Sequence, residues 1–120
     1  MQLKVVSLEE IKHLKDVKIG DMLLCEGNVF MPVKNVIVIS GYPTFFRTSN
    51  NLAFHLSPRI QLKTEKGFKS PELWDVLLIN ENLTPMLTTV NLIERTTFFY
   101  DILIDGNIVS PEGIIFRYSN

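Results

Sequence analysis

The side chains with the most reactive chemistry are one cysteine and two histidines. Cys25 ends an apolar run, and we predict a buried, unreactive thiol, because a nucleophilic cysteine needs a base within reach. His55 lies two positions before Ser57 and shares its strand face, where it could transfer protons; the simpler interpretation is a partly exposed strand residue. His13 is expected near the end of a short helix, where a cation suits the helix dipole. These residues predict no metal site and no cofactor, and a lone cysteine favours the reducing cytoplasm.

Charged residues offer two further candidates. Asp21 and Asp75 hold equivalent places in an internal repeat and could form an acid–base pair, but aspartates that begin turns usually accept backbone amide hydrogens. Lys63, Lys66 and Lys69 lie three residues apart around a glycine turn. No glycine-rich loop or helix N-terminus accompanies them, so we expect a solvated hairpin tip rather than a phosphate site.

Length and composition narrow the classes of protein. A chain of 120 residues predicts one domain, residues 1–120, with room for a core. Twelve basic and 13 acidic residues give a net charge of -1, which argues against a nucleic-acid partner. No apolar run approaches the roughly 20 residues that span a bilayer, so no membrane is expected. Acidic residues come too early at the N-terminus for a signal peptide, and no small-molecule substrate is evident.

The elements that must position these side chains are predicted to be β-strands almost throughout. Residues 36–39, 52–54, 60–62 and 98–104 are rich in β-branched and aromatic types, and turn-forming Gly, Asn and Pro separate them. Only Leu8 to Leu14 favours a helix. Ser7 with Glu10 three residues later fits a capping box, in which each residue satisfies a free amide of the other.

An internal repeat organises the chain. A shift of 54 residues places Asp21–Thr48 on Asp75–Ile102 without a gap. Seven of the 28 positions are identical and keep the same strand face: Asp21/Asp75, Leu23/Leu77, Leu24/Leu78, Asn28/Asn82, Val36/Val90, Ile39/Ile93 and Phe45/Phe99. Two copies are too few for a solenoid. We therefore predict two related β units about a pseudo-twofold axis.

Five blocks, in order, resemble the motifs of Hint domains, the fold shared by inteins and Hedgehog autoprocessing domains. Val17–Leu23 resembles the "L-x-x-G-D-x-V" element, and Leu56–Gly67 is similar to the block that contains "T-P-x-H". Pro71–Leu77 resembles "x-E-L-x-x-G-D-x-L", Phe99–Asn107 resembles "V-Y-D-L-x-V-x-G-N", and Ser110–Phe116 resembles the closing "N-G-I-L-V". The resemblance implies an all-β, pseudo-twofold, horseshoe-like Hint fold, here with one short N-terminal helix.

The resemblance also implies four catalytic positions. A Cys or Ser nucleophile should begin the domain, where this chain has Met1-Gln2. The histidine of "T-x-x-H" falls on Ile60, which cannot transfer a proton. The closing His-Asn pair falls on Arg117 and Tyr118, and Asn120 stands two residues later than the motif requires. We therefore expect an inactive Hint-like fold that is not an enzyme.

Two aromatic clusters, residues 42–46 and 96–100, occupy equivalent places in the repeat. Most of these rings should belong to the core of a small β domain. Because neighbouring strand residues face opposite ways, one ring of each cluster is expected to point outward. Phe46 and Phe98, together with Arg117 and Tyr118 near the C-terminus, are the candidate protein-contact residues.

Two functions follow from these expectations. The first is a non-catalytic structural or adaptor protein whose partners are other protein subunits of an assembly. A single alanine among many Asn, Ile, Lys and Phe is typical of an AT-rich genome, which would suit a tailed-phage virion or baseplate component. The alternative is a residual self-processing protein with intein-like C-terminal cleavage, in which Asn120 is a cleavage product or a cleavage-competent end.

Overall fold

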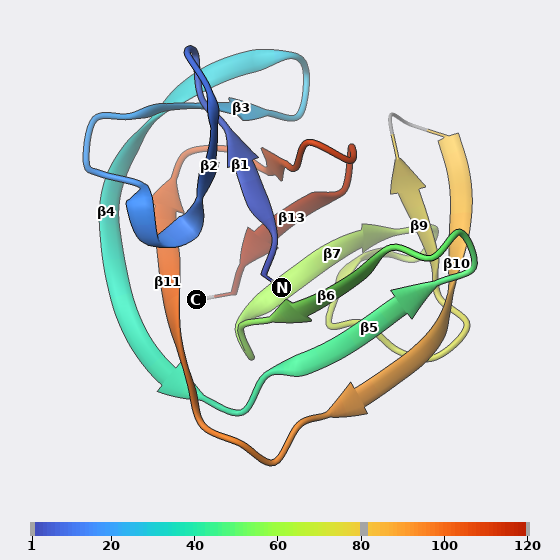
Figure 1. Ribbon diagram of the computed structural model, residues 1–120. Coiled ribbons are helices and arrows are strands. Elements are labelled where there is room, and N and C mark those ends of the chain that lie inside the picture. The colour runs from blue at the N-terminus through green and yellow to red at the C-terminus, as the bar shows by residue number, and fades with distance from the viewer. Residues whose placement is uncertain (1, 80–81, 120) are drawn as a thin grey trace.

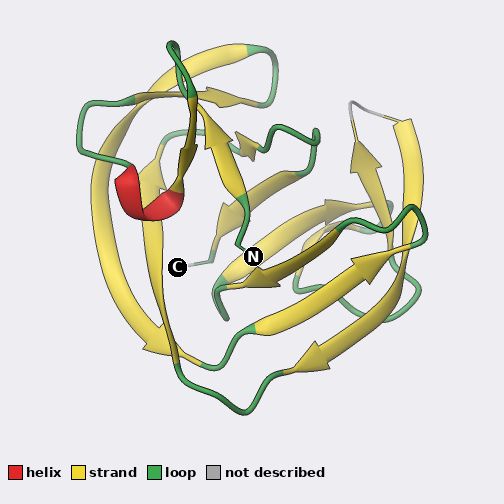
Figure 2. Cartoon of the chain, viewed as in Figure 1, coloured by secondary structure: helices red, strands yellow, loops and turns green. Residues whose placement is uncertain are grey.

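The computed structural model describes residues 2–79 and 82–119. Its elements are almost all strands (Figure 2), with one 3-10 turn at Leu14–Asp16. The first half holds β1 Lys4–Val6, β2 Ile11–His13, β3 Met22–Cys25, β4 Val29–Gly41, β5 Thr44–Thr48 and β6 Ala53–Leu56. The second half holds β7 Ile60–Thr64, β8 Gly67–Lys69, β9 Val76–Ile79, β10 Asn82–Leu92, β11 Thr97–Ile104, β12 Ile108–Val109 and β13 Ile115–Tyr118. No helix that could cross a membrane occurs among the described residues.

One continuous sheet curls on itself to form a horseshoe. Its strands run in the order β11-β4-β3-β12-β13-β7-β9-β10-β5-β6, while β8 pairs with β7 and the β1–β2 hairpin stands apart. Two long antiparallel ribbons, β4 with β11 and β5 with β10, form the curved outer wall (Figure 1). The predicted all-β, horseshoe-like architecture is therefore confirmed. The core lies inside the curve, where Phe46, Phe99 and Phe116 are the largest fully buried side chains.

The repeat seen in the sequence reappears in the hydrogen bonds. The amide of Val33 donates to the carbonyl of Asp21 at 2.9 Å, and 54 residues later the amide of Leu87 donates to that of Asp75 at 2.7 Å. Pairing follows the same rule, since β3 pairs with β4 as β9 pairs with β10. The two units also pair with each other: β4 of the first unit pairs with β11 of the second, and β10 of the second pairs with β5 of the first. This exchange is the pseudo-twofold arrangement that the sequence predicts.

The predicted helix from Leu8 to Leu14 is wrong. The Ser7 hydroxyl does accept the Glu10 amide, at 3.1 Å, as a capping box requires. However, Ser7 also donates its own amide to the Glu10 carbonyl at 2.8 Å, which closes a hairpin turn between β1 and β2. The capping pattern is local, so it cannot distinguish a helix start from a tight β-turn. His13 consequently ends strand β2 rather than a helix.

Trp74 provides a stability prediction from the repeat. Its backbone has a φ of 71°, the left-handed region, whereas its repeat equivalent Gly20 has a φ of 92°. A bulky residue pays a steric penalty in that region of roughly 1–2 kcal/mol, partly offset by the larger chain entropy of glycine. Trp74→Gly should therefore raise the free energy of unfolding by about 0.5–1 kcal/mol in urea titrations. The reciprocal Gly20→Trp should lower it, and equal stability of all three chains would contradict the prediction.

Candidate active site around the C-terminal strand

The last strand, β13, carries the C-terminal segment into the curve of the horseshoe (Figure 1). It pairs with β7, where Tyr118 lies opposite Ile60 and Arg117 opposite Gln61. Ile60 is the residue at the place of the family histidine, and it is buried. The tertiary structure therefore brings the "T-x-x-H"-like block and the chain end together, although no histidine stands there.

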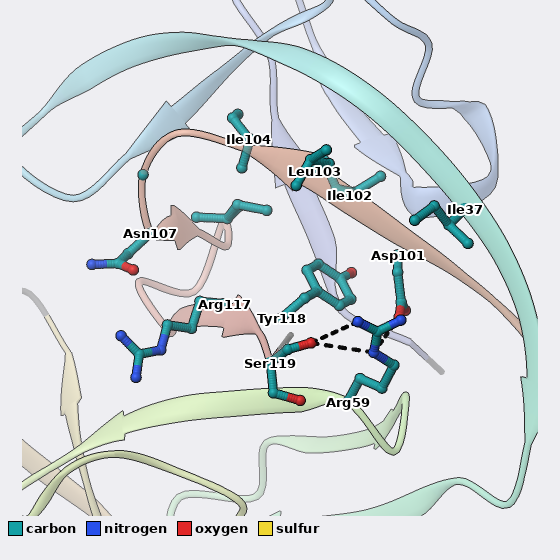
Figure 3. A pocket seen from close by; sticks show the side chains of 12 residues that line it. Ile37, Arg59, Asp101, Ile102, Leu103, Ile104, Asn107, Arg117, Tyr118 and Ser119 are labelled. Atoms are coloured by element: carbon teal, nitrogen blue, oxygen red, sulfur yellow. Dashed lines mark hydrogen bonds and ion pairs between the residues drawn. The ribbon is translucent and has the colours of Figure 1, made fainter.

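Arg59 holds the backbone of Ser119 from both sides. The Ser119 amide donates to the Arg59 carbonyl at 2.7 Å. In return, the Arg59 guanidinium donates to the Ser119 carbonyl oxygen from Nε at 3.2 Å and from Nη2 at 2.8 Å (Figure 3). A carbonyl that accepts two charge-assisted hydrogen bonds is polarised, and its orientation is fixed.

Asp101, on β11, lies beside this arginine. Its Oδ1 accepts the hydroxyl of Ser57 at 3.0 Å, and its Oδ2 lies 3.7 Å from Nε of Arg59. Oδ2 is buried, and within the described part of the chain it accepts no hydrogen bond. Burial raises the pKa of the Asp101 carboxyl above its ordinary value, against the opposing effects of Ser57 and Arg59. A carboxyl with a raised pKa is a better proton acceptor than a solvated one.

A cavity of about 210 Å³ opens between these groups and the inner side of the β4–β11 ribbon. Its apolar wall comes from Ile37, Ile102, Leu103, Ile104 and Ile108, and its polar end from Arg59, Asp101 and the Ser119 backbone. The Tyr118 ring forms another wall, with its hydroxyl donating to the Tyr100 carbonyl at 3.3 Å. Burial raises the pKa of the Tyr118 phenol, so the ring stays neutral. Asn107 and Arg117 also line the cavity, on the side away from Arg59 and Asp101, so it is lined by both apolar and polar side chains (Figure 3).

This arrangement has the parts needed to break a peptide bond. Paired donors on a carbonyl oxygen stabilise the negative charge that develops there during attack. A carboxylate beside the arginine that holds this carbonyl, as Asp101 is, is a candidate to remove or return a proton. Sequence reasoning missed both Arg59 and Asp101. The signal for Asp101 was an acidic residue within the apolar strand Phe99 to Ile104, since buried carboxylates are costly and usually have a role.

The predicted contact residues have different surroundings. Phe98 is 67% exposed, but Phe46 is fully buried, so the expectation that Phe46 faces outward is wrong. Alternation along β5 instead leaves the neighbouring Phe45 partly exposed. Arg117 is exposed and lies over the Phe68 ring at 4.4 Å. Tyr118 is a wall of the cavity rather than an outward ring, because its hydroxyl bonds inside the fold.

The other reactive candidates lie away from this centre. His55 packs against Phe45, with ring centroids 5.3 Å apart, and forms a bridge with Gln2 near the start of the chain. Cys25 is buried, and burial raises the pKa of its thiol, which makes it less reactive. Met1 and Asn120 lie outside the described residues. Within those residues, no group of three His, Cys, Asp or Glu side chains could hold a metal ion.

The aspartates and lysines singled out in the sequence have structural roles. Asp21 and Asp75 accept backbone amides from Lys18 and Glu72, each at 2.9 Å, as expected of turn aspartates. The expected solvated lysine tip is wrong for two of its three members. Lys63 pairs with Glu26, and Lys69 donates to both carboxylate oxygens of Asp75 at 3.1 and 2.9 Å. The strands flanking the turn thus use their lysines to neutralise partly or fully buried carboxylates.

The fold is similar to that of solved inteins. The MchDnaB-1 intein superposes with a TM-score of 0.80 at 12% identity, covering 96% of this chain and 95% of that chain. The Msm DnaB1 intein splicing domain bound with zinc gives 0.78 at 16% identity, covering 98% and 97%. A DnaB intein from Synechocystis sp. PCC 6803 gives 0.76 at 13% identity, covering 98% and 95%. No protein-family model matches the sequence, and no curated protein matches it.

The expectation that this chain is not an enzyme is wrong. It rested on motifs missing from the sequence, whereas the structures that share its fold include an intein splicing domain, a self-cleaving type of protein. At 12–16% identity, the absence of a family motif gives no evidence of inactivity. The charged cluster at β13 is the place in the described structure where such chemistry can be sought.

Proposed function

We propose that this chain is an intein-like self-processing protein that breaks a peptide bond at its own C-terminal end. The observation that carries the proposal is the Ser119 carbonyl, held by two donors of Arg59 beside the buried Asp101 carboxyl. The likeness of the fold to intein splicing domains supports it. Of the two functions considered from the sequence, self-processing is the one that uses this cluster.

The chemistry of the two side chains assigns a different role to each. Arg59 carries a permanent positive charge and stabilises negative charge on the carbonyl oxygen that it holds. Asp101 accepts and returns a proton, and its hydrogen bond from Ser57 fixes the orientation of the carboxyl. The proposal concerns cleavage at the C-terminal end.

The direct test is a chain extended beyond Asn120 by a soluble protein and tagged at its N-terminus. Intact mass spectrometry after incubation between pH 5 and 8 should show loss of the C-terminal extension with time. The N-terminal tag should stay attached and serves as the internal control. An unchanged mass after several days, with the chain folded by circular dichroism, would refute the proposal.

A second candidate is a subunit of a larger protein assembly. The observation that favours it is a group of exposed apolar side chains where the two ribbons meet: Tyr42 at 53%, Leu92 at 63% and Phe98 at 67% exposure. Residues 42–43 and 93–96 connect the ribbons there, since the Ile93 amide donates to the Pro43 carbonyl at 2.9 Å. Exposed apolar groups of this kind often mark protein contacts.

The corresponding prediction concerns self-association. Wild-type chain should associate in a concentration-dependent way in sedimentation equilibrium, and Phe98→Ser should weaken that association about tenfold or more. Leu8→Ser is the matched control, because Leu8 is 63% exposed but lies on the β1–β2 turn. Equal association of all three chains, or a monomer at every concentration, would exclude Phe98 as a self-association contact.

A further inference from the structure

The curled sheet divides into two lobes. The first half of the sheet order, β11-β4-β3-β12-β13, comes from residues 2–41 and 97–119, which together form lobe 1. The second half, β7-β9-β10-β5-β6, comes from residues 44–79 and 82–92, which form lobe 2. Among the described residues, the sheet joins the two lobes through the short β13–β7 pairing and through isolated bridges.

The chain passes from one lobe to the other at a single bend. Strand β4 continues into β5 through Tyr42-Pro43, and β10 continues into β11 through residues 93–96 (Figure 1). The two connections lie side by side, because the Ile93 amide donates to the Pro43 carbonyl at 2.9 Å. The β4–β11 and β5–β10 pairs are therefore two arms of one antiparallel ribbon that bends between the lobes.

The strand register shows what the bend requires. Thr97 pairs with Gly41 on one side of it, and Leu92 pairs with Thr44 on the other. The connection through residues 93–96 is thus two residues longer than Tyr42-Pro43, and it runs outside the shorter one, as the longer path around a bend must (Figure 1). Connections of equal length would keep opposite residues opposite, and the ribbon would run straight.

We propose that this chain forms a dimer with a second copy of itself by exchanging lobes. The ribbon of each copy straightens at the bend, and lobe 1 of each copy packs against lobe 2 of the other. Such an exchange needs no new core, because the contacts that close one chain are used again between two chains. The inference names a partner and a mode of contact, and it does not rest on cleavage at the C-terminal end.

The contacts between the lobes are specific enough to rebuild the same interface between copies. Arg59 of lobe 2 holds the backbone of Ser119 of lobe 1, and the Ser57 hydroxyl of lobe 2 donates to Asp101 of lobe 1 at 3.0 Å. These hydrogen bonds are directional, so they select the matching lobe of another copy. In the dimer, each candidate site would take Arg59 from one copy and Asp101 from the other.

Exposed apolar side chains at the bend favour the exchanged form. Tyr42, Leu92 and Phe98 are each more than half exposed in the single chain. The straightened connections of the two copies span the same gap between the closed pairs of lobes, so these side chains can cover one another there. Pro43 acts in the same direction, because the residue before a proline favours an extended backbone, as a straight β4–β5 strand requires.

Cysteines at the lobe junction distinguish exchange from a surface contact. Gln61 on β7 lies opposite Arg117 on β13, a separation that a disulfide can bridge. Gln61→Cys and Arg117→Cys chains, each with Cys25→Ala, are mixed, unfolded in urea, refolded together at high concentration and mildly oxidised. Exchange predicts a disulfide-linked dimer of one chain of each kind, identified by intact mass. Gln61→Cys mixed with Lys34→Cys is the matched control, because Lys34 is exposed on β4, away from β7.

A deletion at the bend tests the register argument. Removal of Glu94 and Arg95 leaves two residues in each connection, which makes the register continuous. The deletion should raise the dimer fraction about tenfold in size-exclusion chromatography with light scattering, because a shortened hinge favours exchange. The matched control is Glu94→Ser with Arg95→Ser, which removes the same charges but keeps the length, and it should dimerise as wild type does.

The outcomes separate this inference from both proposed functions. In a Gln61→Cys/Arg117→Cys chain, a dimer whose disulfides close within each copy would mean surface contact, which overturns exchange but leaves the assembly function standing. A wild-type chain that stays monomeric after refolding at every concentration overturns both exchange and self-association. If the deleted chain fails to fold, the mixed-cysteine experiment still decides. None of these measurements uses cleavage, so failure of self-processing does not affect them.

Discussion

Asp101→Asn should slow release of a C-terminal extension by about 100-fold or more, the usual contribution of a positioned base. Asparagine has the same shape and can still accept the Ser57 hydroxyl, which lies 3.0 Å from Oδ1 in the wild type. It cannot accept a proton as a carboxylate does, so the chemical step loses its base. Asp105→Asn is the matched control, because Asp105 is exposed, pairs with Lys34 at 2.6 Å and follows the same strand. The rate is measured by intact mass spectrometry.

The dependence on pH gives the same prediction a second readout. Burial raises the pKa of Asp101 above its ordinary value of 3.8, and only the ionised form is a base. The wild-type rate should therefore rise with pH through this raised pKa, and Asp101→Asn should lack the rise. A pH profile that is identical in the two chains, or an Asp101→Asn rate within threefold of wild type, would show that Asp101 is not the base.

As pH rises, the contribution of Asp101 to stability should fall, whereas the rate of cleavage should rise. Because the pKa of Asp101 is higher in the folded chain than in the unfolded one, its stabilising contribution is complete below pH 3.8. That contribution is lost as pH rises through the folded-state pKa. Wild type should therefore lose stability relative to Asp101→Asn over this range in urea titrations. Asp21 and Glu26 have lowered pKa values, so their contribution to stability grows as pH rises. That effect is the same in wild type and in Asp101→Asn and cancels in the comparison.

Lys69→Met should lower the free energy of unfolding by about 2–3 kcal/mol, because it leaves a buried carboxylate without its main cation. The Asp75 side chain is only 2% exposed, and Lys69 contacts both of its oxygens. The Glu72 amide at 2.9 Å and the more distant Lys66 at 3.8 Å remain, which keeps the loss below that of a fully isolated charge. Urea denaturation at pH 7 measures the change.

The repeat supplies the matched control. Lys12 holds the equivalent aspartate, Asp21, at 3.0 Å, but both side chains there are about one-fifth exposed, at 20% and 22%. Water can replace the lysine at that site, so Lys12→Met should cost much less than Lys69→Met. Equal losses at the two sites would mean that burial of Asp75 does not govern the strength of its ion pair.

Several features of the fold could be predicted from sequence because they depend on neighbouring residues. Strand alternation, turn residues and the 54-residue repeat are all local patterns, and the structure confirms the all-β, two-unit arrangement. The helix from Leu8 to Leu14 failed because the Ser7–Glu10 hydrogen bond serves a hairpin equally well. The outward position of Phe46 failed because alternation predicts that one of two neighbours faces inward, but not which one.

The candidate site was decided by the tertiary structure alone. Ser57 and Asp101 are 44 residues apart, and Arg59 and Ser119 are 60 apart, and no local pattern links either pair. They meet because β13 inserts beside β7 and the curled sheet carries β11 across the cavity. The sequence by itself determined the strands, their repeat and the absence of a histidine at Ile60. Only sheet closure decided that an arginine and a buried carboxyl converge on the chain end, because a contact between distant residues depends on how the whole sheet curls.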